Sequence, residues 1–229
     1  MKKFALCLAV LVFLFTAVSC SNTTALDYNN KLSQASEYSF NIVYTDSASE
    51  LPIYISCYKK NDEYAYRFST NGFNNEDLAY RQIFVDDTFY EICESKKGGF
   101  WCGEFKKTEG VDVNYSKNFM FKYTAYITSG SFLTMFSAGE KVDYKGNICT
   151  KTDIAYEGAT YTFFFQDETS NLVKFSMTNS EGTKTLEYSD YKFGDIDEEC
   201  LIVPSVSLQI GTIQLYREVT DFTYEYFIS

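Results

Sequence analysis

Apolar and polar residues alternate with a period of two through most of the chain after residue 37. The stretch "YSFNIVY" (38–44) is an example, since its aromatic and aliphatic residues alternate with Ser39 and Asn41. This pattern is typical of a strand with one buried face. Similar stretches follow one another, separated by short polar connections, which predicts a succession of antiparallel hairpins.

Two segments depart from this period. Before the first strand, the sequence Thr24-Ala25-Leu26-Asp27 could form a capping box, and Tyr28, Leu32 and Ala35 follow at helical spacing. A short amphipathic helix over 25–36 is therefore expected. The alternation is lost again over 116–137, where "SFLTMFS" suits a short helix.

Short connections fix the register of the expected hairpins, because a shift by one residue turns every side chain to the other face. A turn at Asn61-Asp62 brings the apolar residues of 53–57 and 64–68 to one face. The connection 167–171 joins "YTFFFQ" to "LVKFSM". That hairpin pairs Phe165 with Val173, Phe163 with Phe175 and Tyr161 with Met177.

A disulfide is expected in the hairpin that follows residue 88. A turn at Lys97-Gly98 sets Cys93 opposite Cys102, and opposed strand residues lie within the Cα separation of about 4.4–6.8 Å that a disulfide requires. The same register sets Glu91 opposite Glu104, which is unfavourable. Buried free thiols are the alternative.

The first twenty residues have a different composition. After Met1-Lys2-Lys3, the run Phe4–Val18 contains one polar side chain, Thr16, and has the length of a signal-peptide core rather than a membrane-spanning helix. The sequence Ala17-Val18-Ser19-Cys20 resembles the lipobox of bacterial lipoprotein precursors. This resemblance implies cleavage after residue 19, acylation of Cys20 and a lipidated tether over 20–24. An ordinary cleaved signal, or an uncleaved anchor with an incidental cysteine, are the alternatives.

The net charge bears on the partners to be expected, and the aromatic content bears on the secondary structure. The loss of Lys2 and Lys3 with the signal changes the net charge from −11 to −13, which disfavours nucleic acid and anionic lipid head groups as partners. The chain has 20 Tyr and 21 Phe against one Trp and two Pro, a balance that favours strands.

The order of these elements resembles the LolA-like lipoprotein carriers and related glycolipid-carrying lipoproteins. The resemblance rests on a leading helix, successive strands, a helical interruption, the hairpin "DETSNLVKFSM" and the closing segment "YSDYKFGDIDEECLIVP", and covers about Ala25 to Pro204. It implies an α+β fold, mostly antiparallel β, in which short helices cover a curved half-open β-barrel with a hydrophobic cavity between them. The extension 205–229 departs from the family and is expected to add strands.

A carrier needs a water-excluding pocket lined by apolar side chains. One face of the expected sheet supplies candidates for this lining, and a filled core is the alternative. The candidates are Phe40, Ile42, Ile53, Ile55, Tyr66, Phe68, Tyr90, Trp101, Phe105, Phe163, Phe165 and Phe175.

Catalysis is not expected. The chain has no histidine, which removes the Ser-His-Asp and Cys-His arrangements and the commonest general base, and it has neither G-x-S-x-G nor a Gly-rich phosphate loop. A hydrolase with two carboxylates stays open, although the carboxylates gather at expected turns. Asp195, Asp197 and Glu199 lack the glycine and the distant glutamate of a calcium loop, so neither a metal nor a cofactor is expected.

The sequence therefore predicts an extracytoplasmic lipoprotein that is held on a membrane through Cys20. It is expected to bind a lipid, an acyl group or a lipoprotein without catalysing a reaction. The alternative is a surface protein with a filled core that binds a protein partner through its acidic face or through "TDFTYEYFI" (220–228). Five cysteines remain beyond Cys20, so at least one thiol is free or pairs with another chain.

Overall fold

The computed structural model describes residues 23–74, 78–97, 100–111, 139–203 and 215–220. The predicted signal peptide, Cys20 and the predicted helix within 116–137 lie outside these residues. The described elements, in chain order, are α2 (Thr23–Gln34), β1 (Glu37–Asp46), β2 (Ile53–Lys60), β3 (Glu63–Ser69), β4 (Ala79–Val85), β5 (Thr88–Lys97), β6 (Phe100–Glu109), β7 (Glu140–Tyr144), β8 (Asn147–Tyr156), β9 (Ala159–Gln166), β10 (Leu172–Asn179), β11 (Gly182–Phe193), the 3-10 helix η2 (Glu198–Leu201) and β12 (Leu215–Glu218).

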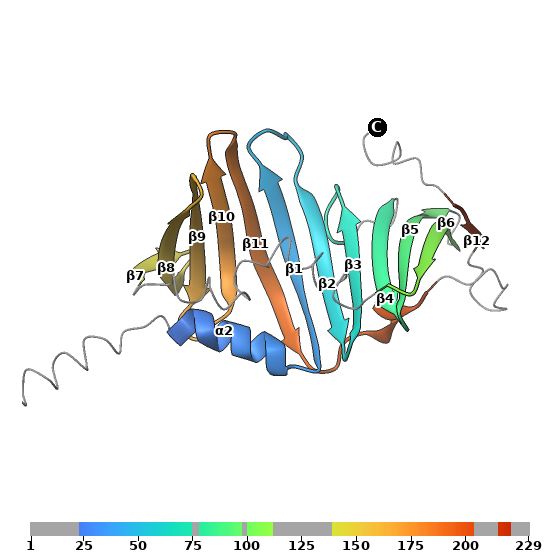
Figure 1. The fold of residues 1–229 in the computed structure, drawn as a ribbon, viewed down its shortest axis with the longest axis horizontal. Helices are drawn as coiled ribbons and strands as arrows, with labels where there is room; N and C mark the ends of the chain where they lie inside the picture. The colour runs from blue at the N-terminus through green and yellow to red at the C-terminus, as the bar shows by residue number, and fades with distance from the viewer. Residues whose placement is uncertain (1–22, 75–77, 98–99, 112–138, 204–214, 221–229) are drawn as a thin grey trace, which may run out of the picture.

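All twelve strands belong to one sheet in the order β12-β6-β5-β4-β3-β2-β1-β11-β10-β9-β8-β7. Strands β1 to β6 form one meander and β7 to β11 another, and the antiparallel pairing of β1 with β11 joins the two. Strand β12 pairs with β6 in parallel, whereas the other pairs are antiparallel. Figure 1 shows the result as a broad open fan with β7 and β12 at its two ends. The prediction of a mostly antiparallel sheet with few helices is confirmed for the described residues.

Two irregularities interrupt the strand pairing, one at the centre of the sheet and one between β9 and β10. The register of β1 with β11 shifts between Ser39 and Asn41, opposite Asp190, whose φ is 55°. Strand β10 has a similar shift between Leu172 and Lys174. Such bulges increase the local twist and curvature of a sheet.

The sheet buries apolar side chains on both faces. We call the inner face the one that carries Phe40, Ile42 and Phe163; there a large cluster runs from β4 and β5 to β8 and includes Ala25 and Tyr28 of helix α2. The opposite, outer face carries a smaller cluster over β3 to β6, formed with Ile196, Leu201 and Tyr216. The described chain therefore has two cores separated by one sheet.

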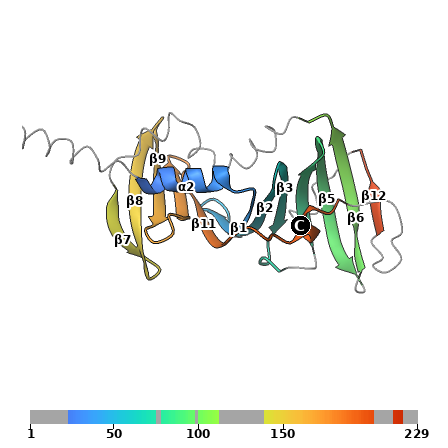
Figure 2. The same ribbon diagram turned by 90° about the horizontal axis from the view of Figure 1, so that it is seen from below.

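Helix α2 lies across the lower ends of β9, β10 and β11 in Figure 1, and Figure 2 shows it on one side of the sheet. The helix begins at Thr23 and ends at Gln34, so both ends lie two residues earlier than the range 25–36 expected from the sequence. The chain leaves the helix at Ala35, whose carbonyl oxygen accepts a hydrogen bond from Lys59 Nζ at 2.6 Å. Among the described helices, none is long and apolar enough to cross a membrane.

The register predicted for the turn at Asn61-Asp62 is confirmed, since Ile55 lies opposite Phe68 and Cys57 opposite Tyr66. In the β9–β10 hairpin, Phe163 lies opposite Phe175 and Tyr161 opposite Met177, as predicted. The third predicted pair is wrong because the bulge in β10 moves Val173 out of register. Phe165 lies opposite Leu172 instead.

The predicted disulfide between Cys93 and Cys102 is also wrong. Lys97 pairs with Phe100, so the turn is centred one residue later than Lys97-Gly98, and Cys93 lies opposite Glu104. Both cysteines are free thiols, as are the other described cysteines, Cys57, Cys149 and Cys200.

Charge explains why this hairpin takes the later turn. The predicted register set Glu91 opposite Glu104, whereas in the structure Glu91 lies opposite Lys106. Opposite charges on facing strand residues are favourable, and like charges are not. The shift is by two residues along the partner strand, so every side chain keeps its face.

Candidate ligand-binding face

Most of the residues expected to line a ligand site lie together on the inner face. They come from β1, β2, β3, β9 and β10, and all belong to the inner cluster or pack against it. They are Phe40, Ile42, Ile53, Ile55, Tyr66, Phe68, Phe163, Phe165 and Phe175. The side chain of Trp101 lies outside the described residues.

Tyr90 and Phe105 were placed on this face by the sequence pattern, and this placement is wrong. Both belong to the cluster on the outer face. The reason is the connection between β3 and β4, which is too long to fix a register from sequence. It sets Gln82 opposite Tyr66, so Ile83 and its partner Tyr90 point to the other side of the sheet.

The inner face is wider than the helix that lies on it. Nine strands from β5 to β8 contribute to the cluster, and at about 4.8 Å between strands they span roughly 38 Å along the sheet. Helix α2 has 12 residues and is therefore about 18 Å long. The side chains of this face are nonetheless buried; Ile42 and Ile55 are 1% and 2% exposed.

Beneath α2 the inner face is filled, and its polar atoms are paired. The ring of Tyr28 lies 5.9 Å from that of Phe165, and its hydroxyl is 3.1 Å from the hydroxyl of Tyr191. Tyr191 in turn donates a hydrogen bond to the carbonyl oxygen of Leu172 at 2.8 Å. Burial raises the pKa of both phenols, so they stay neutral. This end of the face has the properties of an ordinary core.

Lys31 fixes the position of α2 over this core. Its Nζ atom donates to Asn171 Oδ1 at 2.9 Å and lies 4.2 Å from the centre of the Phe193 ring. Burial lowers the pKa of the Lys31 ammonium. The contacts tie the helix to the β9–β10 connection and to the end of β11.

The other end of the inner face carries a polar cluster that the sequence analysis missed. On β4, Tyr80 and Gln82 are 8% and 6% exposed, and Glu91 lies opposite Gln82 on β5. Tyr80 donates a hydrogen bond to Glu91 Oε1, and Gln82 Nε2 lies 3.0 Å from the Tyr80 hydroxyl oxygen. Alternation in "AYRQIFV" was the available signal, since it places Tyr80, Gln82 and Phe84 on one side of a strand.

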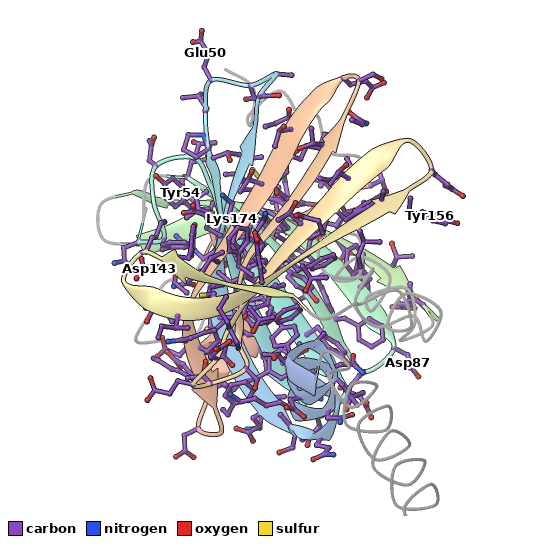
Figure 3. All side chains as sticks on the ribbon, turned by 90° about the vertical axis from the view of Figure 1, so that its left-hand side faces the viewer. Glu50, Tyr54, Asp87, Asp143, Tyr156 and Lys174 are labelled. Carbon is purple, nitrogen blue, oxygen red and sulfur yellow. The ribbon has the colours of Figure 1, made fainter. Side chains whose placement is uncertain are left out.

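Several carboxylates lie on exposed turns at the ends of strands. Asp62, Asp86 and Asp87 are exposed at turns, and Figure 3 shows Glu50 and Asp87 pointing outward from the tips of their loops. Asp197 accepts a hydrogen bond from the backbone N–H of Glu199 and so caps η2. Within the described residues, no group of His, Cys, Asp and Glu has the arrangement of a metal site.

No family model matches the sequence, and no curated protein matches it either. Several solved structures have a similar fold at low identity. An uncharacterised conserved protein from Thermus thermophilus is 10% identical, with a TM-score of 0.45 over 86% of this chain and 99% of that chain. Lipoprotein LppX from Mycobacterium tuberculosis is 14% identical, with a TM-score of 0.44 over 80% of this chain and 98% of that chain.

A chain of the Pseudomonas aeruginosa MucA/MucB complex is 12% identical, with a TM-score of 0.40; the match covers 79% of this chain and 61% of that chain. At TM-scores below 0.5, these similarities carry no argument about function. The resemblance to LolA-like carriers stays a prediction.

Proposed function

We propose that this protein is an extracytoplasmic lipoprotein, anchored to a membrane through acylated Cys20, that binds the apolar part of an amphiphilic ligand without catalysis. The ligand is a lipid or the acyl group of a lipoprotein. It lies against the inner face of the sheet, beyond the part that α2 covers, in the half-open barrel predicted from the sequence.

The observation that carries this proposal is the mismatch between the inner face and its helix. An apolar surface of about 38 Å along the sheet is paired with one described helix of about 18 Å. A sheet must cover its apolar face with another layer, and a bound ligand can provide part of that layer.

The residues of this face suit an apolar ligand. Rings from β1, β3, β9 and β10 supply large, rigid contact areas, and Ile42 and Ile55 supply aliphatic contacts at the centre. Burial of each CH₂ group of an acyl chain contributes about 0.8 kcal/mol, so a long chain gains enough from burial alone to bind without charged contacts.

The absence of catalysis is part of the same proposal. The chain has no histidine, and the carboxylates at the turns described above are exposed and lie away from the inner face. Glu91 is a carboxylate on the inner face, and it accepts a hydrogen bond from Tyr80. Binding by burial is the function that these residues can perform.

The experiment that tests the proposal is mass spectrometry of an organic extract from the chain Ser21–Ser229, secreted behind an export signal that attaches no lipid and purified without detergent. This chain lacks Cys20, so a recovered lipid must be held by the fold. A lipid at about one molecule per chain is expected. An empty protein that also takes up no added lipid would overturn the proposal.

A protein-binding function is the second candidate, and the open edges of the sheet favour it. Among the described strands, β7 pairs with β8 alone and β12 with β6 alone. Unpaired edges can recruit a strand from another protein. Deletion of residues 205–229 separates the two functions, because loss of a partner with an unchanged lipid content would favour protein binding.

A further inference from the structure

The polar cluster of Tyr80, Gln82 and Glu91 fixes the orientation of the Gln82 side chain. An ionised carboxylate can only accept hydrogen bonds, so the single proton of the Tyr80 hydroxyl is used in its bond to Glu91 Oε1. The Tyr80 oxygen must then accept from Gln82, and only Nε2 can donate. The amide oxygen of Gln82 therefore points away from Tyr80.

Gln82 Oε1 is buried and needs a donor. Among the described residues, it has no hydrogen-bond partner. Gln82 is 6% exposed, so bulk water does not satisfy the amide oxygen. Most buried side-chain polar atoms in proteins have a partner, and an exception calls for an explanation. A ligand that carries a hydrogen-bond donor would supply the missing partner.

Gln82 lies next to the apolar side chains of the inner face. Gln82 lies opposite Tyr66 in the register, and Phe84, two residues along the same strand, belongs to the inner cluster. The ring of Tyr80 lies 5.7 Å from that of Phe68. An alkyl chain on the rings of β3 would thus bring its polar end to Gln82.

Charges around the cluster are balanced, which indicates an uncharged donor. On the same face, Glu91 lies opposite Lys106, and Arg217 forms an ion pair with Glu104. A carboxylate head group would meet the oxygen of Gln82 and the carboxylate of Glu91, both of which are acceptors. A hydroxyl group can donate to Gln82 Oε1 without adding a buried charge.

We propose that Gln82 Oε1 anchors the hydroxyl group of a neutral amphiphile, such as a long-chain alcohol or an acylglycerol, whose chain lies on the inner face over β3 and β2. The inference rests on the proposed function and makes it more specific, since it selects hydroxylated neutral lipids over fatty acids and over lipids without a donor. Gln82 acts as a specificity residue, while the rings supply the affinity.

The experiment measures displacement of the neutral fluorescent probe N-phenyl-1-naphthylamine from the chain Ser21–Ser229, after delipidation, by 1-dodecanol, dodecyl methyl ether and dodecanoate at pH 8. The alcohol is expected to displace the probe at a concentration about 5- to 10-fold lower than the ether, the gain of one net hydrogen bond. Dodecanoate is expected to be the weakest of the three.

The variant Gln82→Met tests the residue, because methionine has a similar length and no hydrogen-bonding amide. It should bind the ether as the unmodified protein does and lose the preference for the alcohol. Gln166→Met is the matched control, since Gln166 is on β9 and its Nε2 donates to Asn147 on the outer side of the sheet; its preference should be unchanged.

Each outcome decides the inference. Equal displacement by alcohol and ether in the unmodified protein, or an undiminished preference in Gln82→Met, would overturn the role of Gln82 while leaving lipid binding intact. A protein that binds neither the probe nor any of the three amphiphiles would overturn the proposed function and this inference with it. If Gln82→Met does not fold, the comparison of alcohol with ether in the unmodified protein still tests the inference, because equal displacement by the two would overturn it.

Discussion

The hydroxyl of Tyr144 on β7 donates a hydrogen bond to Glu187 Oε1 on β11 at 2.7 Å, although the two strands are four places apart in the sheet. In a flat sheet they would be about 19 Å apart. The ring of Tyr144 also lies 5.1 Å from that of Phe164 on β9. Strand β7 therefore folds back across the outer face, and this end of the sheet is strongly coiled.

This contact predicts that Glu187 contributes to stability above pH 4. Burial alone would raise the pKa of Glu187, but hydrogen bonds from Lys145 and Tyr144 and the nearby positive charges lower it below its ordinary value. A group whose pKa is lower in the folded state stabilises the fold above its unfolded pKa, about 4.3 for Glu, and loses this contribution as the pH falls through the folded value.

The measurement is urea unfolding of the unmodified protein and Glu187→Gln between pH 3 and 7. Glu187→Gln should be less stable at pH 7, and the difference between the two proteins should shrink as the pH falls from 5 to 3. A difference that is constant over this range would show that the ionised carboxylate has no part in the contact.

A second prediction concerns strand β12, which a buried hydrogen bond holds to the sheet. The hydroxyl of Tyr216 donates to Glu94 Oε2 at 2.7 Å. The register aligns Tyr216 with Gly103 on β6 and Gly103 with Glu94 on β5. Gly103 has no side chain in the path, and a Cβ atom there would come within 2.2 Å of the carbonyl oxygen of Cys93.

Tyr216→Phe should therefore destabilise the protein by about 1–3 kcal/mol, because it leaves a buried carboxylate without one of its donors. Arg81 remains beside Glu94, with its Nε 2.8 Å from Oε1 but at an angle that is too bent for a hydrogen bond. Urea unfolding measures the effect. Arg217→Met is the control for the exposed ion pair on the same strand and should cost less than about 1 kcal/mol.

The cysteines give a third prediction. The five described cysteines are free, so the chain Ser21–Ser229 should titrate five thiols in denaturant without a reductant. In the folded protein at pH 8, Cys57 and Cys149 should react most slowly with an alkylating reagent, because they are 2% and 0% exposed and burial raises the pKa of both thiols. Mass spectrometry of alkylated peptides measures both. Three thiols instead of five would indicate one disulfide and contradict the structure.

Alternation and tight turns predicted the strands, the leading helix and the register of the β2–β3 hairpin. The Asn61-Asp62 turn fixed its register because a shift would have exposed Ile55 or Tyr66, and the helix boundaries were within two residues. The pairing of Cys93 failed because two neighbouring turn positions both keep the apolar face intact. The charge of Lys106 decides between them.

Long-range geometry was beyond the sequence pattern. The bulge at Val173 leaves no signature in "LVKFSM", and the face of Tyr90 depends on the long connection between β3 and β4. The polar cluster was missed because Gln82 looks like an ordinary polar strand position until its burial is known. Nine of the lining candidates share the inner face, because the sequence alternates regularly on β1, β2 and β3 and on the β9–β10 hairpin.

A fourth prediction tests the membrane anchor. One acyl chain binds a membrane only marginally, whereas two or more anchor a protein stably. Cys20→Ser should therefore move the protein from the membrane fraction of the producing bacterium to the soluble extracytoplasmic fraction. Radiolabelled palmitate should label the unmodified chain and leave Cys20→Ser unlabelled. Palmitate labelling that persists in Cys20→Ser would contradict the lipobox assignment.

The central claim, that the inner face holds a ligand, is tested most directly by the lipid content of two tryptophan variants. Ile55 lies on the inner face and is 2% exposed, whereas Val43 points to the outer face from the adjacent strand. Both variants are purified without detergent in the Ser21–Ser229 form. The extracted lipid is quantified by mass spectrometry against the unmodified chain, and circular dichroism verifies that each variant is folded.

We expect Ile55→Trp to remain folded and to lose the lipid, because the indole occupies space that the ligand uses, and Val43→Trp to keep it. In a filled core, Ile55→Trp would instead cost about 1–3 kcal/mol through overpacking, and the unmodified chain would contain no lipid. A folded Ile55→Trp with unchanged lipid content, or an unmodified chain without lipid, would contradict the account.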